Sequence, residues 1–239
     1  MRLFTISRTL LVLAGAVVGI AFRSEAGIIT VPPGLSPGDT YRLVFVTSGT
    51  TTATSTDIND YNTFVSNAAN AVTALADLNA TWTVIGSTST TDARDNIGHP
   101  DGYIYSLSGT EVCNSTGCLF SGSLYAPINT TELGATSSFG DVVWTGSNSA
   151  GTEFTFLSYF QPLGSTGRTM YGIIAPAPPY SEWLCRGSSD LPENSWPLYA
   201  ISSQLTVPNS EVPESTTIGL TALGGAILLF AMRRKQVRP

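Results

Sequence analysis

The chain has 239 residues and a mass of 25.2 kDa, a length that suits one domain of ordinary size with additional terminal segments. Seventeen acidic residues oppose eleven Lys and Arg residues, which argues against a nucleic-acid-binding protein, because such a protein needs a basic face to neutralise phosphates. The charges are unevenly distributed, since residues 27–211 contain four arginines, fifteen acidic residues and no lysine. The composition therefore predicts an acidic body between two basic ends.

The N-terminal segment has the pattern of a secretory signal peptide. Arg2 and Arg8 precede an uninterrupted apolar run at 10–22, which is shorter than the roughly 20 helical residues that cross a membrane. The stretch that follows ends in Ala26, which predicts cleavage before Gly27. An uncleaved membrane anchor is the alternative, and the short apolar run disfavours it.

The C-terminal segment has a different pattern. Residues 216–232 carry no charge and reach about 25 Å as a helix, the lower limit for spanning a bilayer. The basic residues at 233–235 should stay on the cytoplasmic side, which places the body outside. We therefore expect a transmembrane helix over 216–232.

The order of these parts resembles a known sorting signal. The sequence Val212-Pro213-Glu214, one weakly apolar helix and a terminal Arg-rich cluster resemble the PEP-CTERM tail of bacterial exosortase substrates. The usual motif is Val-Pro-Glu-Pro, and Ser215 stands here in place of the second proline. The resemblance implies that a membrane-embedded cysteine-type transpeptidase or protease cuts near this motif. A permanent single-pass anchor is the alternative, and both place the body beyond the inner membrane.

The body has the pattern of an α+β domain. A strand is expected at 41–46 and a surface loop at 47–56. Asp57 can cap one main helix, and a second strand follows at 82–85, with a helical turn at 91–94. The remaining chain reads as short strands between Gly, Asn and Ser, ending in a strand at 198–201 that continues toward 205–207. The apolar positions of the predicted helix are Ile58, Tyr61, Phe64, Val65, Ala68, Val72 and Leu75.

The order of motifs in the body resembles the endostatin-like branch of the C-type-lectin-like fold found in bacterial surface proteins. The resemblance implies one main helix and many short, mostly antiparallel strands. This family often joins its helix to its last strand by a disulfide, and neither segment carries a cysteine here. The matching segments are Phe-Val-Thr-Ser at 45–48, the Trp-containing strand at 82–87, the Gly-Thr hairpin at 108–112, residues 127–129 with 131–134, residues 143–146 with Gly151, and the strand at 198–201.

Three cysteines are present. In an exported chain, Cys113 and Cys118 can close a small loop by a disulfide, while a bond from either one to Cys185 is the competing pairing. A cysteine protease needs a histidine beside its thiol, and the only histidine, His99, lies in a predicted exposed turn.

The sequence offers no catalytic set and no cofactor site. A serine hydrolase would need a nucleophile elbow with a histidine, and fifteen acids make carboxylate pairs uninformative for a glycosidase. Calcium is the more plausible ligand, because Asp92, Asp95, Asn96 and Asp101 concentrate oxygen donors, although their spacing is not that of an EF-hand. Asp92 reads equally well as a helix cap. Because the spacing of these donors is not that of an EF-hand and Asp92 can serve as a helix cap instead, we expect no metal site.

The four tryptophans divide into two pairs. Trp82 and Trp144 lie in strand-like segments and are expected in the core. Trp183 and Trp196 lie in irregular segments and could reach the surface as part of a ligand platform.

These patterns predict three regions: a signal peptide at 1–26, a C-type-lectin-like body at 27–209, and a sorting tail at 210–239. The expected function is that of a non-enzymatic surface or extracellular-matrix protein, sorted by an exosortase-like enzyme. Its expected partners are the membrane, through the C-terminal helix, and exopolysaccharide. A carbohydrate- or ligand-binding adhesin is the alternative, and a hydrolase is a third reading.

Overall fold

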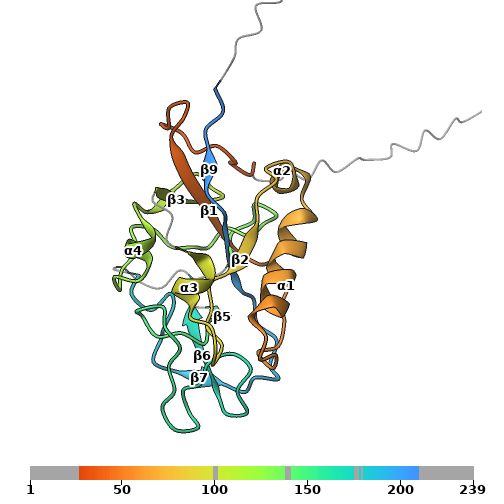
Figure 1. Cartoon of the computed structure of the whole chain (residues 1–239), viewed down its shortest axis with the longest axis vertical. Helices are drawn as coiled ribbons and strands as arrows, with labels where there is room; N and C mark the ends of the chain where they lie inside the picture. The colour runs from red at the N-terminus through yellow and green to blue at the C-terminus, as the bar shows by residue number, and fades with distance from the viewer. Residues whose placement is uncertain (1–26, 99–101, 138–140, 175–177, 179, 210–239) are drawn as a thin grey trace, which may run out of the picture.

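The computed structural model describes residues 27–98, 102–137, 141–174, 178 and 180–209, which form a mixed α+β fold with few helices and many strands (Figure 1). Both predicted terminal segments, with the cleavage site at Ala26 and the motif at Val212-Pro213-Glu214, lie outside the described residues, as do His99 and Asp101. Within those described ranges, no helix has the length and apolar character needed to cross a membrane.

The helices and strands are short, apart from one main helix. The helices are α1 (Ile58–Asn70), α2 (Thr73–Ala76), α3 (Ala93–Ile97) and α4 (Thr116–Leu119). The strands are β1 (Thr40–Val46), β2 (Trp82–Val84), β3 (Tyr103–Ser106), β4 (Glu111–Cys113), β5 (Val142–Trp144), β6 (Thr169–Ile173), β7 (Ser189–Asp190), β8 (Tyr199–Ser202) and β9 (Leu205–Thr206).

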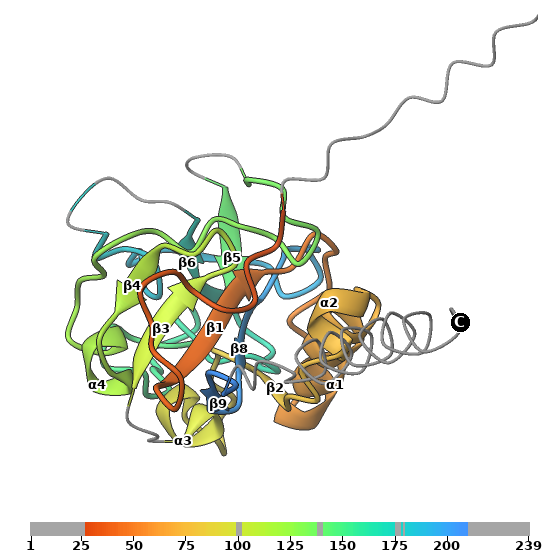
Figure 2. The same ribbon diagram turned by 90° about the horizontal axis from the view of Figure 1, so that it is seen from above.

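The strands form two sheets. The larger has the order β2-β8-β1-β3-β4, with β9 paired to the beginning of β1, and the smaller has the order β5-β6-β7. The pair β1–β3 is parallel, and the other pairs of named strands are antiparallel. Seen from above, α1 and α2 lie together on the side of β2, whereas α4 lies beside β4 (Figure 2). A backbone hydrogen bond of 3.0 Å from Trp144 to Pro197 links β5 to the chain that enters β8.

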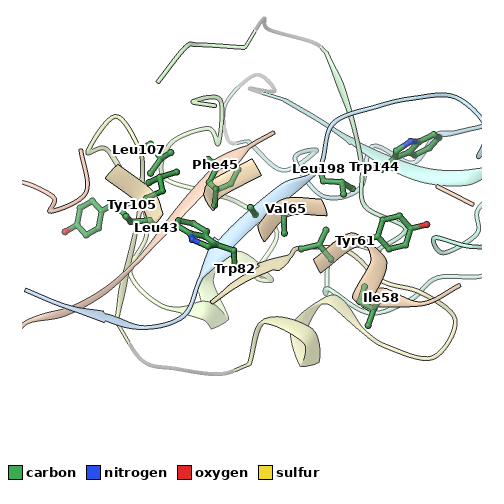
Figure 3. Close-up of a cluster of buried hydrophobic side chains, with 14 of the residues drawn as sticks. Leu43, Phe45, Ile58, Tyr61, Val65, Trp82, Tyr105, Leu107, Trp144 and Leu198 are labelled. Carbon is green, nitrogen blue, oxygen red and sulfur yellow. The ribbon is translucent and has the colours of Figure 1, made fainter. Parts of the chain in front are cut away.

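Strand β1 is central because both of its faces are buried. Leu43 and Phe45 face a hydrophobic cluster with α1, which Figure 3 shows in close-up. Val44 and Val46 belong to a second cluster on the opposite face. Arg42 is also buried and donates from Nε to the Ser202 carbonyl at 2.6 Å, and desolvation by burial lowers its pKa to about 10. Because side chains on both faces of β1 are buried, its sequence is a nearly continuous apolar run and does not alternate between apolar and polar residues.

Helix α1 begins where the sequence predicts. The Asp57 side chain accepts a hydrogen bond from the Asn59 N–H at 2.9 Å, which caps the helix. The prediction that one helix continues to Leu75 is wrong, because α1 ends at Asn70 and Val72 is extended (φ −108°, ψ 114°) before α2. Leu75 is nevertheless buried, so the apolar spacing persists across the break.

Two local predictions need correction. Residues 47–56 are not wholly a surface loop: Ala53 is buried, and Thr51 and Trp196 exchange two backbone hydrogen bonds of 3.0 Å. The helical turn predicted at 91–94 corresponds to helix α3, which begins later and spans Ala93–Ile97. Asp92 occupies its N-cap position, but the carboxylate accepts a hydrogen bond from the Glu153 N–H at 2.6 Å instead of capping the helix.

Candidate ligand-binding cleft

A cleft of about 380 Å³ opens between the chain after β1, the turn that leads to β5, the end of β6 and the chain before β8. Its volume lies within the usual range of small-molecule sites. The cleft therefore collects segments that are far apart in the sequence. Its lining residues are Thr47, Ser48, Thr50, Thr131, Ser137, Asp141, Val142, Ile174, Ser195, Trp196 and Pro197.

Hydroxyl groups dominate this lining, and three of them are committed to the fold. Thr47 donates to the Gly49 carbonyl at 2.7 Å, and Thr131 accepts from the Ala135 N–H at 3.2 Å. Ser48 is bonded to Glu132, as described below. The hydroxyls of Thr50, Ser137 and Ser195 have no such role in the described contacts, and they are therefore available to a ligand.

A buried carboxylate fastens one wall of the cleft. Glu132 is only 5% exposed, and its two oxygens accept hydrogen bonds from the Ser48 N–H at 2.8 Å and the Ser48 hydroxyl at 2.5 Å. The Val46 N–H also donates to the Thr130 carbonyl at 3.1 Å. The bonds between Ser48 and Glu132 join residues 45–48 to residues 131–134, two of the segments on which the lectin-like resemblance rests.

The other wall carries Trp196, whose backbone is fixed by the pairing with Thr51. The indole Nε1 of Trp196 is buried and has no hydrogen-bond partner among the described residues. Nearby, burial raises the pKa of Asp190, but hydrogen bonds from the Leu191 N–H and the Asn194 side chain, together with the charge of Arg168, outweigh that effect, so the pKa is lowered. The half-buried Trp196 is thus held at the cleft by the pairing of its backbone with Thr51.

The remaining tryptophans lie in the core. Trp82 and Trp144 are buried, which confirms the prediction made from their strand-like surroundings. The prediction that Trp183 could reach the surface is wrong, because it is 1% exposed and its ring lies 5.5 Å from that of Tyr199. Trp196 is therefore the tryptophan that lines the cleft.

The structure joins Cys113 and Cys118 in a disulfide, with Cα atoms 5.7 Å apart, which is the first of the pairings considered from the sequence. Helix α4 begins within this loop, and the Ser115 hydroxyl accepts a hydrogen bond from the Cys118 N–H at 3.2 Å. Cys185 stays outside the disulfide, and its thiol donates to the Met170 sulfur at 3.8 Å. The disulfide lies outside the lining of the cleft.

The described residues contain no group of three or more His, Cys, Asp or Glu side chains that could hold a metal ion. Two of the oxygen donors considered for calcium form hydrogen bonds within the fold: Asp92 accepts from the Glu153 N–H, and Asn96 exchanges two hydrogen bonds with Asn62 at 2.9 and 3.0 Å.

No family model matches the chain, and no curated protein shows significant similarity to it. Its function must therefore be argued from the chemistry of the cleft. The described lining combines an indole, three available hydroxyls and the carboxylate of Asp141, and it includes no Lys, Arg or His. Such a lining suits a small, neutral ligand that has both apolar and hydroxylated faces.

Proposed function

We propose that the protein is an exported, non-enzymatic surface or extracellular-matrix protein whose C-type-lectin-like body binds a neutral carbohydrate beside Trp196. One observation carries the binding role: an indole and three available hydroxyls, those of Thr50, Ser137 and Ser195, line one cleft of suitable size. The indole can pack against the C–H face of a sugar ring while the hydroxyls bond its hydroxyl groups.

The charge of the body supports a neutral ligand over an anionic one. Residues 27–211 carry four arginines against fifteen acidic residues, and Asp141 lines the cleft itself. An anionic polysaccharide would meet like charge there without a cation to offset it. A neutral exopolysaccharide is therefore the partner that we propose.

The lectin-like assignment within this proposal draws support from two features. The segments at 45–48 and 131–134, which the resemblance treats separately, are in direct contact through Ser48 and Glu132. The last strands, β8 and β9, both pair with the first strand, β1, which brings the two ends of the body together.

A fluorescence titration tests the binding role. Because Trp82, Trp144 and Trp183 are buried, Trp196 should dominate any change in emission when neutral oligosaccharides such as cello- and malto-oligosaccharides are added. Measured by calorimetry, which does not need the indole as reporter, Trp196→Ala should abolish binding. Thr50→Val should weaken binding about fivefold, since a good hydrogen bond is worth about 1 kcal/mol. Thr54→Val, at an exposed threonine outside the cleft, should bind as the wild type does. The absence of binding, or binding that Trp196→Ala leaves unchanged, would refute the proposal.

One contact favours a hydrolase as the alternative function. The Ser48 hydroxyl lies 2.5 Å from Glu132, which is the contact between a nucleophile and a general base. Both Glu132 oxygens already bind Ser48, so this carboxylate is not free to act across the cleft with Asp141. Release of reducing sugars during the titration, lost in Ser48→Ala, would establish hydrolysis and contradict a purely binding role.

Export and sorting can be tested separately by the intact mass of the protein from its native host. A species that begins at Gly27 and ends near Val212-Pro213-Glu214 is expected in culture or surface fractions. A species found only in membranes, and still carrying residues 233–235, would show a permanent anchor and overturn the exosortase part of the proposal.

A further inference from the structure

A hairpin between β5 and β6 exposes an apolar surface that belongs to neither hydrophobic cluster. Phe156 and Phe160 exchange two backbone hydrogen bonds, of 2.8 and 3.3 Å, across its turn. The exposed fractions are 38% for Phe154, 54% for Phe156, 69% for Leu157 and 59% for Tyr159. No charged residue occurs between Glu153 and Arg168. We call residues 154–160 the apolar tip.

The apolar tip is held in a conformation that is unfavourable for its most exposed residue. Leu157 has a φ of 53°, in the left-handed region that side chains with a Cβ rarely adopt. Its carbonyl accepts a hydrogen bond from the Gln161 side chain, and the Ser158 carbonyl accepts one from the Arg168 N–H at 2.9 Å. A Cβ at Gly167 would lie 2.8 Å from the Ser158 carbonyl oxygen, so the hairpin packs closely on the following chain. The surroundings thus impose this backbone, and strain of this kind is common where a site is pre-organised.

The position of the tip sets it apart from the ends of the body. In Figure 1 the chain between β5 and β6, coloured green to teal, forms loops beside and beyond β7 at one end of the molecule. The described C-terminus, after β9, lies at the opposite end.

We propose that the apolar tip inserts into the interfacial region of a lipid bilayer. Large side chains bury 150–250 Å² each, so the exposed fractions leave only about 400 Å² of surface on the tip. A stable protein complex needs about 800 Å² from each partner, which is more than the tip offers. A fluid bilayer accepts a convex, uncharged tip, and Phe, Tyr and Leu are side chains suited to its interface.

The tilt of the aromatic rings disfavours a sugar chain as the occupant of the tip. The ring of Phe160 lies 6.4 Å from that of Phe154 and 6.3 Å from that of Phe156, with interplanar angles of 48° and 39°. These tilted rings do not form a flat platform. Residues 27–209 carry four arginines and fourteen acidic residues, so the body should be repelled by anionic lipids and should prefer zwitterionic ones.

Vesicle flotation with residues 27–209 tests the inference. This span contains both hydrophobic clusters whole and lacks both terminal apolar runs, so it is the folded unit and carries no other membrane segment. We expect it to float with phosphatidylcholine vesicles, and to float less with phosphatidylglycerol vesicles at low salt. Leu157→Asn should reduce the bound fraction at least threefold, and together with Tyr159→Ser at least tenfold.

Matched variants separate lipid binding from folding. Asn tolerates the left-handed backbone better than Leu, so Leu157→Asn should keep or raise the thermal midpoint while binding falls. Tyr125 is 56% exposed outside the hairpin, and Tyr125→Ser should float as the wild type does. The inference is overturned if the wild type stays with the unbound protein, or if Tyr125→Ser loses as much binding as Tyr159→Ser. Self-association that Leu157→Asn abolishes, without flotation, would overturn it in favour of a second copy.

Discussion

Gly172 shows how one residue decides where a distant tryptophan lies. The chain at residues 182–186 crosses β6, where Ile173 donates to the Glu182 carbonyl at 3.0 Å and Arg186 donates to the Tyr171 carbonyl at 3.1 Å. A Cβ on Gly172 would sit 1.8 Å from the Trp183 carbonyl oxygen. Because glycine has no Cβ, the two backbones can meet, and Trp183 packs in the core.

Gly172→Ala should therefore lower the free energy of unfolding by about 3 kcal/mol, the upper part of the usual range for overpacking, because the obstructing atom belongs to backbone. Urea denaturation followed by tryptophan fluorescence measures the change. Gly117→Ala in α4 is the matched control, since the nearest atom to its Cβ is the Ser115 hydroxyl oxygen at 3.8 Å. Equal stability of the two variants would show that the crossing is loosely packed.

The sequence could place Trp82 and Trp144 but not Trp183, and the reason is physical. The first two lie in segments whose own residues favour buried strands, so a local pattern is sufficient. Burial of Trp183 depends instead on the space that Gly172 leaves on another element. The contact of Ser48 with Glu132 could not be predicted from a local pattern either, because the chain after β1 and the turn before β5 meet only in the folded protein.

At the scale of elements, polar side chains close the free edge of β2. This strand ends the larger sheet, and its outward backbone groups would otherwise be unpaired. Asn62 of α1 accepts from the Val84 N–H at 2.9 Å, and Asn96 of α3 donates to the Val84 carbonyl at 2.8 Å. Ser66 donates to the Trp82 carbonyl at 2.9 Å. Helix α1 thus packs its apolar face on the core and uses polar residues to seal the neighbouring edge.

We expect Asn62→Ala to lower the free energy of unfolding by about 1–3 kcal/mol, because the Val84 N–H loses its acceptor and Asn96 loses its partner. Chemical denaturation measures the effect. Asn67→Ala is the control on the same helix, since Asn67 is exposed and alanine is the better helix former there. If the two variants are equally stable, the side chains do not contribute to the edge as described.

The helix itself illustrates what periodicity can predict. Asp57 and the apolar spacing after it locate the start and the buried face of α1. The same spacing continues through Leu75, so it carries no sign of the break at Val72, where the backbone becomes extended. Periodicity reports which residues face the core, and it does not report whether the backbone between them stays helical.

For the whole molecule, buried tyrosines govern the response to alkaline pH. Burial raises the pKa of Tyr41, Tyr61, Tyr105 and Tyr199 above the ordinary value of 10.0. Above about pH 10 the unfolded chain releases these protons more readily, so stability is fully present below that pH and is lost as the pH rises. Arg42 acts in the opposite direction: burial lowers its pKa to about 10, so its contribution to stability rises as the pH increases above about 10 toward the ordinary arginine pKa.

Tyr199→Phe isolates the largest part of this effect. At neutral pH the variant should lose about 1 kcal/mol, since the Tyr199 hydroxyl donates to the Ile173 carbonyl at 3.1 Å and that acceptor would be left buried. Between about pH 8 and about pH 11, however, its free energy of unfolding should fall by about 1.4 kcal/mol less than that of the wild type. This figure arises because pH 11 lies about one unit above the pKa of tyrosine in the unfolded chain, and each such unit is worth about 1.4 kcal/mol. Urea midpoints at the two pH values give the comparison, with Tyr125→Phe as the exposed control. If Tyr199→Phe and the wild type show the same pH dependence, ionisation of Tyr199 does not limit stability, and alkaline unfolding must begin elsewhere in the molecule.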